Sequence, residues 1–156
     1  MNDTREILRH WRERLPEDRL AHLVRDAGRA LTRTLAARLA TEGIAFGHWA
    51  FLRVLWGEDG LTQRELAERA GMTEPTTATA LATMEREGWV SRGQQGGNRR
   101  KVYVTLTPAG QALRARLVPL AEQINEVAVR GASAAEIETV RRLLLRMLAN
   151  LADDDM

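Results

Sequence analysis

Two helix-start signals on either side of a glycine turn constrain the fold of this chain more than any other feature. A capping box begins at Thr62, whose hydroxyl can cap one backbone amide while Glu65 reaches back to another. Gly71 supplies a tight turn, and Thr73 is the N-cap of a second helix that Gly88 closes. Two short helices around a glycine turn predict a helix-turn-helix.

The second of these helices has two distinct faces. Thr77, Leu81 and Met84 fall on one side, which we expect to pack on the domain. The other side carries small hydroxyl and methyl groups at helical spacing, on Thr76, Thr79, Ala80 and Thr83. Such a face can approach base edges in a major groove, where threonine can hydrogen-bond a base or touch a thymine methyl. The plainer interpretation is an exposed polar surface.

A β-hairpin is predicted to follow the second helix. Residues 89–92 and 101–107 have the alternating pattern of strands, with Val102, Val104 and Leu106 on one face of the second. The glycine-rich segment between them ends in Arg99 and Arg100, so the hairpin is typical of a wing that reaches a minor groove. A solvated turn is the alternative for these two arginines.

Helices dominate the rest of the chain. The apolar spacing predicts a short helix that stops near Pro16 and longer helices over 17–41, 47–56, 108–130 and 134–152. Pro119 is expected to kink the helix over 108–130. The predicted fold class is therefore mainly α with a small β-hairpin. A winged helix-turn-helix domain over 44–107 is flanked by helical regions over 1–43 and 108–156.

The flanking helices carry apolar stripes that a small winged domain cannot cover. A helix of about 20 residues spans roughly 30 Å. Pairing these helices between two copies would bury the stripes and place two recognition helices about 34 Å apart, as an inverted-repeat DNA site requires. The alternative is a three-helix bundle within one monomer.

Composition narrows the function classes. With 0 Cys there is no thiolate metal site, disulfide or cysteine nucleophile, and a cytoplasmic location is expected. No apolar run approaches the roughly 20 residues of a membrane helix, so no membrane partner is expected. The histidines lack close metal spacing and no phosphate-binding glycine loop precedes a helix, so we predict no catalytic residue, metal or cofactor. Of the 23 basic residues only Lys101 is lysine; arginine suits phosphate recognition, but its excess also follows from a GC-rich genome.

This ordered set of motifs resembles the MarR family of bacterial transcriptional regulators over about residues 17–150. The resemblance lies in Leu61-Thr62-Gln63-Arg64-Glu65-Leu66-Ala67, Gly71-Met72-Thr73-Glu74-Pro75-Thr76-Thr77, Leu81, Met84-Glu85, Gly88-Trp89-Val90, Arg92, Asn98-Arg99-Arg100 and Val104-Thr105-Leu106-Thr107-Pro108-Ala109-Gly110. The resemblance implies a homodimer that binds double-stranded DNA at an inverted-repeat operator, more commonly as a repressor than as an activator.

The predicted DNA-binding residues combine the two helices with the wing. They are Thr62, Gln63, Arg64, Thr73, Thr76, Thr79, Thr83, Arg86, Arg92, Asn98, Arg99 and Arg100. The family wing often carries Asp-x-Arg, and here Asn98 occupies the place of the aspartate without its charge, which puts wing ordering in doubt. The second helix also lacks Lys and Arg between Thr73 and Glu85, although a basic residue is frequent in the family where this chain has Thr79.

The resemblance also implies a small, often aromatic and anionic effector between the dimer helices and the winged domain. The candidate contacts are Trp11, Arg14, His48, Trp49 and Arg53, because aromatic faces suit a ring and arginine suits a carboxylate. Three of them have a plainer interpretation: Trp49 as core, His48 in a local hydrogen bond and Arg14 at the surface. The competing function is a winged-helix protein-interaction module that does not bind DNA.

Overall fold

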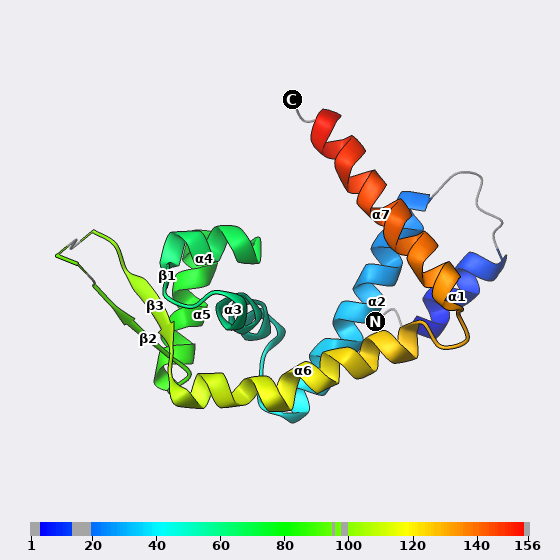
Figure 1. Cartoon of the computed structure of the whole chain (residues 1–156). Coiled ribbons are helices and arrows are strands. Elements are labelled where there is room, and N and C mark those ends of the chain that lie inside the picture. The colour runs from blue at the N-terminus through cyan, green and yellow to red at the C-terminus, as the bar shows by residue number, and fades with distance from the viewer. Residues whose placement is uncertain (1–3, 14–19, 95, 98–99, 155–156) are drawn as a thin grey trace. The chain divides into compact units, whose positions relative to one another are not determined.

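The computed structural model describes residues 4–13, 20–94, 96–97 and 100–154, and its helices and hairpin strands follow the predicted order. Figure 1 shows the elements α1 (Thr4–Glu13), α2 (Leu20–Thr41), α3 (Phe46–Gly57), β1 (Leu61–Thr62), α4 (Gln63–Ala70), α5 (Glu74–Arg86), β2 (Val90–Gly93), β3 (Tyr103–Leu106), α6 (Pro108–Ala128) and α7 (Ala134–Asp154). In the part of the chain that is described, no helix is both long and apolar enough to cross a bilayer.

The helix-turn-helix prediction is confirmed in detail at α4 and α5. The Thr62 hydroxyl accepts the Glu65 amide at 3.3 Å, and the Glu65 carboxylate accepts the Thr62 amide at 2.8 Å, which completes the capping box. Gly71 ends α4 in the left-handed region at φ 65°, where a side chain would be strained. Thr73 then caps α5 by accepting the amide of Thr76 at 3.4 Å.

The predicted hairpin is part of a three-stranded antiparallel sheet in the order β1-β3-β2. Val90 pairs with Leu106 across the hairpin, and Leu61 in β1 pairs with Val104 on the other edge of β3. The sequence prediction missed β1, because two residues are too few to show alternation. The strand β3 begins only at Tyr103, so Val102 lies outside it and is 38% exposed, unlike the buried Val104 and Leu106.

The winged domain has its own apolar core. Phe51, Leu52 and Leu55 of α3 pack with Leu66 of α4, and the α5 face that contains Leu81 is also buried there. The α5 side carrying Thr77, Leu81 and Met84 is fully buried, as predicted. The core therefore fixes which face of α5 remains exposed.

The beginning of α6 is locked onto this domain by a close backbone approach at Gly110. A Cβ atom added to Gly110 would lie 2.0 Å from the Trp89 carbonyl oxygen, so only glycine fits there. The Gly110 carbonyl accepts the indole N–H of Trp56 at 3.0 Å, and Leu113 and Leu117 continue into the core. The helix continues through Pro119.

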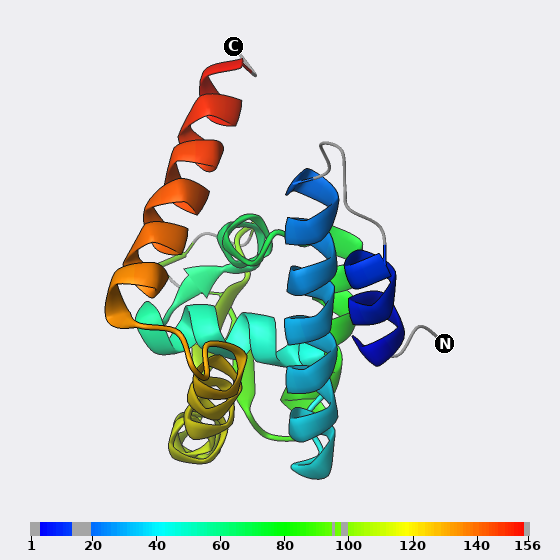
Figure 2. The same ribbon diagram turned by 90° about the vertical axis from the view of Figure 1, so that its right-hand side faces the viewer.

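The flanking helices bury much less of their apolar surface. In α2 only Leu39 is buried, and Leu20, Leu23 and Leu31 are exposed by 39% or more. The short helix α1 lies beside α2, as the two views in Figures 1 and 2 agree, and the Trp11 indole donates to Asp26 at 3.1 Å. No residue of α7, which is described along its whole length, is buried.

The last helix begins as predicted from its sequence. The Glu136 carboxylate accepts the Ser133 amide at 2.7 Å, while the Ser133 hydroxyl accepts the Glu136 amide at 3.3 Å. These hydrogen bonds from Ser133 hold the pKa of Glu136 below its usual value. The helix is therefore set by its own capping box, although its apolar residues remain exposed.

Candidate nucleic-acid interface

The exposed face of α5 carries the threonines predicted to approach DNA. Thr76 and Thr79 are exposed, whereas Thr83 and Ala80 are half-buried. The Thr79 hydroxyl donates to the Pro75 carbonyl at 3.1 Å, and the Thr73 hydroxyl donates to that of Thr76 at 2.9 Å. The opposite face is fixed in the core, so this face is the one that α5 offers to a partner.

An open hollow lies beside this face of α5. Its volume is about 490 Å3, and it is lined by Pro75, Thr76, Thr79, Ala80, Thr83, Ala45, Gly47 and His48. The His48 ring packs edge-on against Trp89 at 5.8 Å between centroids. Burial lowers the pKa of His48 below its ordinary value of 6.5, which favours the neutral imidazole. The residues that line the hollow therefore supply no cation.

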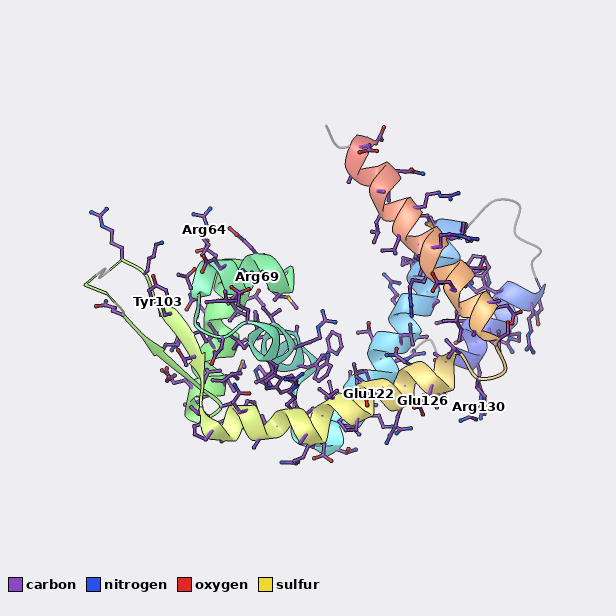
Figure 3. All side chains as sticks on the ribbon, in the orientation of Figure 1. Arg64, Arg69, Tyr103, Glu122, Glu126 and Arg130 are labelled. Atoms are coloured by element: carbon purple, nitrogen blue, oxygen red, sulfur yellow. The ribbon has the colours of Figure 1, made fainter. Side chains whose placement is uncertain are left out.

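Three predicted DNA-binding residues at the start of α4 differ in how far their side chains are exposed. Thr62 is buried, and its hydroxyl is occupied by the capping box, in which it contacts the Glu65 carboxylate at 2.6 Å. Gln63 is half-buried, and its backbone N–H donates to the Val102 carbonyl at 2.8 Å. Arg64 is exposed and projects away from α4 in Figure 3, pairing with Glu68 at 3.0 Å. Arg64 is thus the α4 residue of the three with a charge to offer a phosphate.

The base of the wing is tied to the end of α5 by an ion pair that sequence reasoning did not find. The Arg92 guanidinium donates to one Glu85 oxygen at 2.8 and 3.1 Å, and the Arg92 amide donates to the other oxygen at 3.1 Å. These hydrogen bonds lower the pKa of the Glu85 carboxyl. Arg92 therefore has a positioning role between β2 and α5 in addition to any contact with DNA.

The wing tip is only partly described. Asn98 and Arg99 lie outside the described residues, so their predicted roles stay predictions. Gly96 and Gly97 have φ values of 63° and 72°, a conformation that suits glycine in a reversing turn. Arg100 is exposed where the chain returns towards β3. Figure 1 shows this hairpin extending beyond the helices that pack on the sheet.

Two further residues, which the sequence analysis did not predict for the site, hold its elements together by hydrogen bonds. The Asp59 carboxylate accepts the amides of Gly60 and Leu106, both at 2.9 Å, and so attaches the α3–β1 turn to strand β3. The Thr107 hydroxyl donates to the Gly88 carbonyl just after α5. The Asp59-Gly60 pair is a recognisable turn signal, but its distant partner in β3 has no local signature in the sequence.

The described residues among those predicted to contact an effector lie on different elements and in different surroundings. Trp11 lies between α1 and α2, His48 lines the hollow beside α5, and Arg53 is exposed on α3. Trp49 is 6% exposed and packs against Trp56 at 5.7 Å between ring centroids, which agrees with its interpretation as core. Arg14 lies outside the described residues.

The chain is similar to known transcriptional regulators in both sequence and fold. The MarR family profile matches residues 47–102, from α3 to the wing. The HTH-type transcriptional repressor Rv2887 of Mycobacterium tuberculosis is 30% identical over 139 residues, which cover 86% of this chain and 94% of that protein. The chain belongs to the MarR family. MarR proteins are DNA-binding regulators, and the exposed α5 face and the wing of this chain agree with that function.

A second sequence relative agrees with this assignment, and a solved structure shows the same fold. The transcriptional regulator HosA of Escherichia coli is 31% identical over 100 residues, covering 64% of this chain and 74% of HosA. A MarR family regulator from Listeria monocytogenes, solved in complex with a 26mer DNA, has the same fold with a TM-score of 0.77 at 23% identity. That likeness covers 88% of this chain and 91% of the Listeria protein. The chain is thus a transcriptional regulator of the MarR type.

Proposed function

We propose that this MarR-type regulator is a homodimeric repressor that binds an inverted-repeat operator with one α5 helix in each half-site. The observation that carries the proposal is the exposed threonine face of α5, which the core of the winged domain holds outward. A major groove admits an α-helix, and small side chains allow close approach to the base edges. The name of the M. tuberculosis relative as a repressor supports the direction of regulation.

The homodimer is supported by the apolar surface of the flanking helices. On α7, Val140, Leu143, Leu144, Leu145, Leu148 and Leu151 are exposed by 38–65%, and on α2 Leu20 and Leu23 are exposed by 61% and 43%. Large apolar side chains left exposed in this number along a helix are typical of a protein interface. Pairing between two copies would bury it and relate two α5 helices by a twofold axis.

The phosphate contacts of the proposed complex come from outside the recognition helix. Arg64 at the start of α4, Arg86 at the end of α5 and Arg100 in the wing are exposed, and α5 itself has no arginine before Arg86. Arginine at the edges of the interface can hold the phosphate backbone while α5 reads the bases. The wing arginine would enter the neighbouring minor groove, where the negative potential is strong.

A binding experiment tests the regulator against the protein-interaction alternative. Fluorescence anisotropy would compare duplexes with an inverted repeat, selected from a random library by the full chain, with the same duplexes after one half-site is scrambled. We expect a preference of at least 100-fold and affinity that falls steeply with salt. Equal binding to both duplexes, or none in modest salt, would contradict the proposal.

An effector is also proposed, as a small aromatic carboxylate that weakens operator binding. Of the predicted contacts, His48 lines the hollow beside α5, where its ring is placed to contact an aromatic effector, while the hollow itself supplies no cation for the carboxylate. A ligand that favours the wrong separation of the two α5 helices would be coupled to DNA binding by about 1–3 kcal/mol, or roughly 5–150-fold. Titration of benzoate-like acids into the labelled operator complex should shift its affinity by such a factor, and no shift with any acid would refute this part.

A further inference from the structure

The recognition face of α5 is unusual in having no side chain that reads a base by paired hydrogen bonds. Between Thr73 and Glu85 there is no Arg, Lys, Asn or Gln, which are the residues that recognise guanine or adenine in this way. Beyond the Glu74 carboxylate in the first turn, the polar groups on this face are the hydroxyls of the exposed Thr76 and Thr79 and of the half-buried Thr83. Base specificity at α5 therefore depends on what these threonines can still offer.

The hydroxyl hydrogens of two of these threonines are already used within the helix. Thr79 donates to the Pro75 carbonyl at 3.1 Å, and Thr83 donates to the Thr79 carbonyl at 3.5 Å. The Thr83 oxygen also accepts the Arg86 guanidinium at 3.2 Å. A hydroxyl has a single hydrogen. Thr79 is thus left with an acceptor and a methyl group, and Thr83 chiefly with a methyl group.

Only one kind of base pair matches both of these groups in the major groove. An A·T pair presents the adenine N6 amino group as a donor and the thymine C5 methyl as an apolar contact. A G·C pair presents the guanine acceptors N7 and O6 and the cytosine N4 donor, but it has no methyl group, so the methyl contact is what separates the two kinds of pair. An acceptor-plus-methyl surface therefore gains from A·T pairs and gains little from guanine.

We infer that Thr79 and Thr83 read A·T pairs in each half-site, through contact of their methyl groups with thymine C5 methyls and acceptance of an adenine N6 hydrogen by the Thr79 oxygen. This inference rests on the proposed entry of α5 into the major groove. Ala80 lies between the two threonines on the same face and lines the same open hollow, so the surface has apolar room for a methyl group. Specificity comes from the methyl contacts and from the hydrogen bond that the Thr79 oxygen accepts, while the flanking arginines supply the phosphate attraction.

The test removes single methyl groups from the DNA. After an operator has been selected with the full chain, each thymine in a half-site is replaced in turn by deoxyuridine, which lacks only the C5 methyl. At the positions under α5 we expect binding to weaken about fourfold for each thymine methyl that is removed. In Thr83→Ser the deoxyuridine at the position facing this residue should have no further effect, because the protein methyl that would touch it is already absent.

Two controls make the result specific. Thr139→Ser on α7 removes the methyl of another helical threonine whose hydroxyl donates to a carbonyl four residues back, at 2.9 Å, and it should leave the deoxyuridine effect unchanged. Replacing adenine by 2-aminopurine, which lacks the N6 amino group, should weaken binding by wild type but not by Thr79→Val. Both outcomes would support the separate roles of the methyl and the oxygen.

The inference and the proposed function fail in different ways. If no inverted repeat is selected, the proposed function is wrong. If an operator is bound tightly but no deoxyuridine substitution weakens binding, or if 7-deazaguanine in place of a guanine under α5 abolishes it, then the A·T reading is wrong while the regulator stands.

Discussion

Helix α5 buries its large apolar side chains, whereas helix α7 leaves its own exposed. In α5, Leu81 and Met84 are completely buried, whereas in α7 Leu145, Leu148 and Leu151 are exposed by 60% or more. The winged domain can therefore be stabilised within one chain, while the flanking helices retain apolar surface that a second copy would cover. In the proposed dimer, DNA binding and dimerisation would therefore be assigned to different regions of the molecule.

The largest expected effect comes from disrupting the apolar surface of α7 and leaving the winged domain intact. Leu144→Asp combined with Leu148→Asp places two charges on this surface, where a dimer would have to bury them. We expect a monomer by sedimentation velocity, a decrease in operator affinity of at least 100-fold and an unchanged thermal unfolding of the winged domain. Arg142→Ala, a control at an exposed position of the same helix, should remain dimeric. A double variant that stays dimeric would contradict the role of α7.

The reverse experiment disrupts the winged domain at its tightest point. Gly110→Ala would drive a Cβ into the Trp89 carbonyl oxygen and force the start of α6 away from it. Overpacking of this kind costs about 1–3 kcal/mol of unfolding free energy, measured by chemical denaturation. Gly28→Ala is the matched control, since Gly28 is helical with nothing within 4 Å of its added Cβ, and it should be neutral or stabilising. Equal stability of the two variants would show that the packing at Gly110 is unimportant.

A smaller effect is expected at the junction of α5 and the wing. Hydrogen bonds from Arg92 lower the pKa of Glu85 below its ordinary 4.5, so the ionised carboxylate is favoured in the folded protein. This contribution to stability is complete above pH 4.5 and is lost as pH falls through the lowered pKa. The unfolding free energies of wild type and Glu85→Gln should therefore differ at pH 7 by less than about 1 kcal/mol, because solvent screens this exposed pair, and they should converge in acid. A constant difference across this range would exclude the ion pair as its cause.

The smallest expected effect is on the salt dependence of DNA affinity when a single arginine of the wing or of α7 is removed. Removing one phosphate contact lowers the slope of log affinity against log salt by about 0.9. We expect Arg100→Ala in the wing to show this reduction, whereas Arg146→Ala on α7, at another exposed arginine, should not. An Arg100→Ala protein with unchanged affinity and slope would contradict the wing contact.

Much of the fold was predictable because its signals are local. The capping boxes at Thr62 and Ser133, the N-cap at Thr73 and the buried stripe of α5 each involve residues a few turns apart at most. The contacts that complete the site join distant positions, such as Asp59 with Leu106, 47 residues apart, and Trp56 with Gly110. No periodic pattern in the sequence indicates such long-range pairings, so only the structure could show them.

The candidate site was predictable to a similar degree. The sequence identified the exposed threonine face and the arginines around it, since helical spacing separates them from the core. It did not reveal that the Thr62 side chain is buried at its capping box or that Arg92 is tied to Glu85. Both depend on hydrogen-bond partners and burial that are decided by packing.

Native mass spectrometry of the operator complex is the decisive measurement for a dimeric regulator, because it counts the chains on one duplex. We predict two copies of the 17.5 kDa chain on each inverted-repeat duplex, and a free protein of twice the chain mass. A single chain bound to the duplex with full affinity, or a free monomer that binds both half-sites independently, would contradict this arrangement.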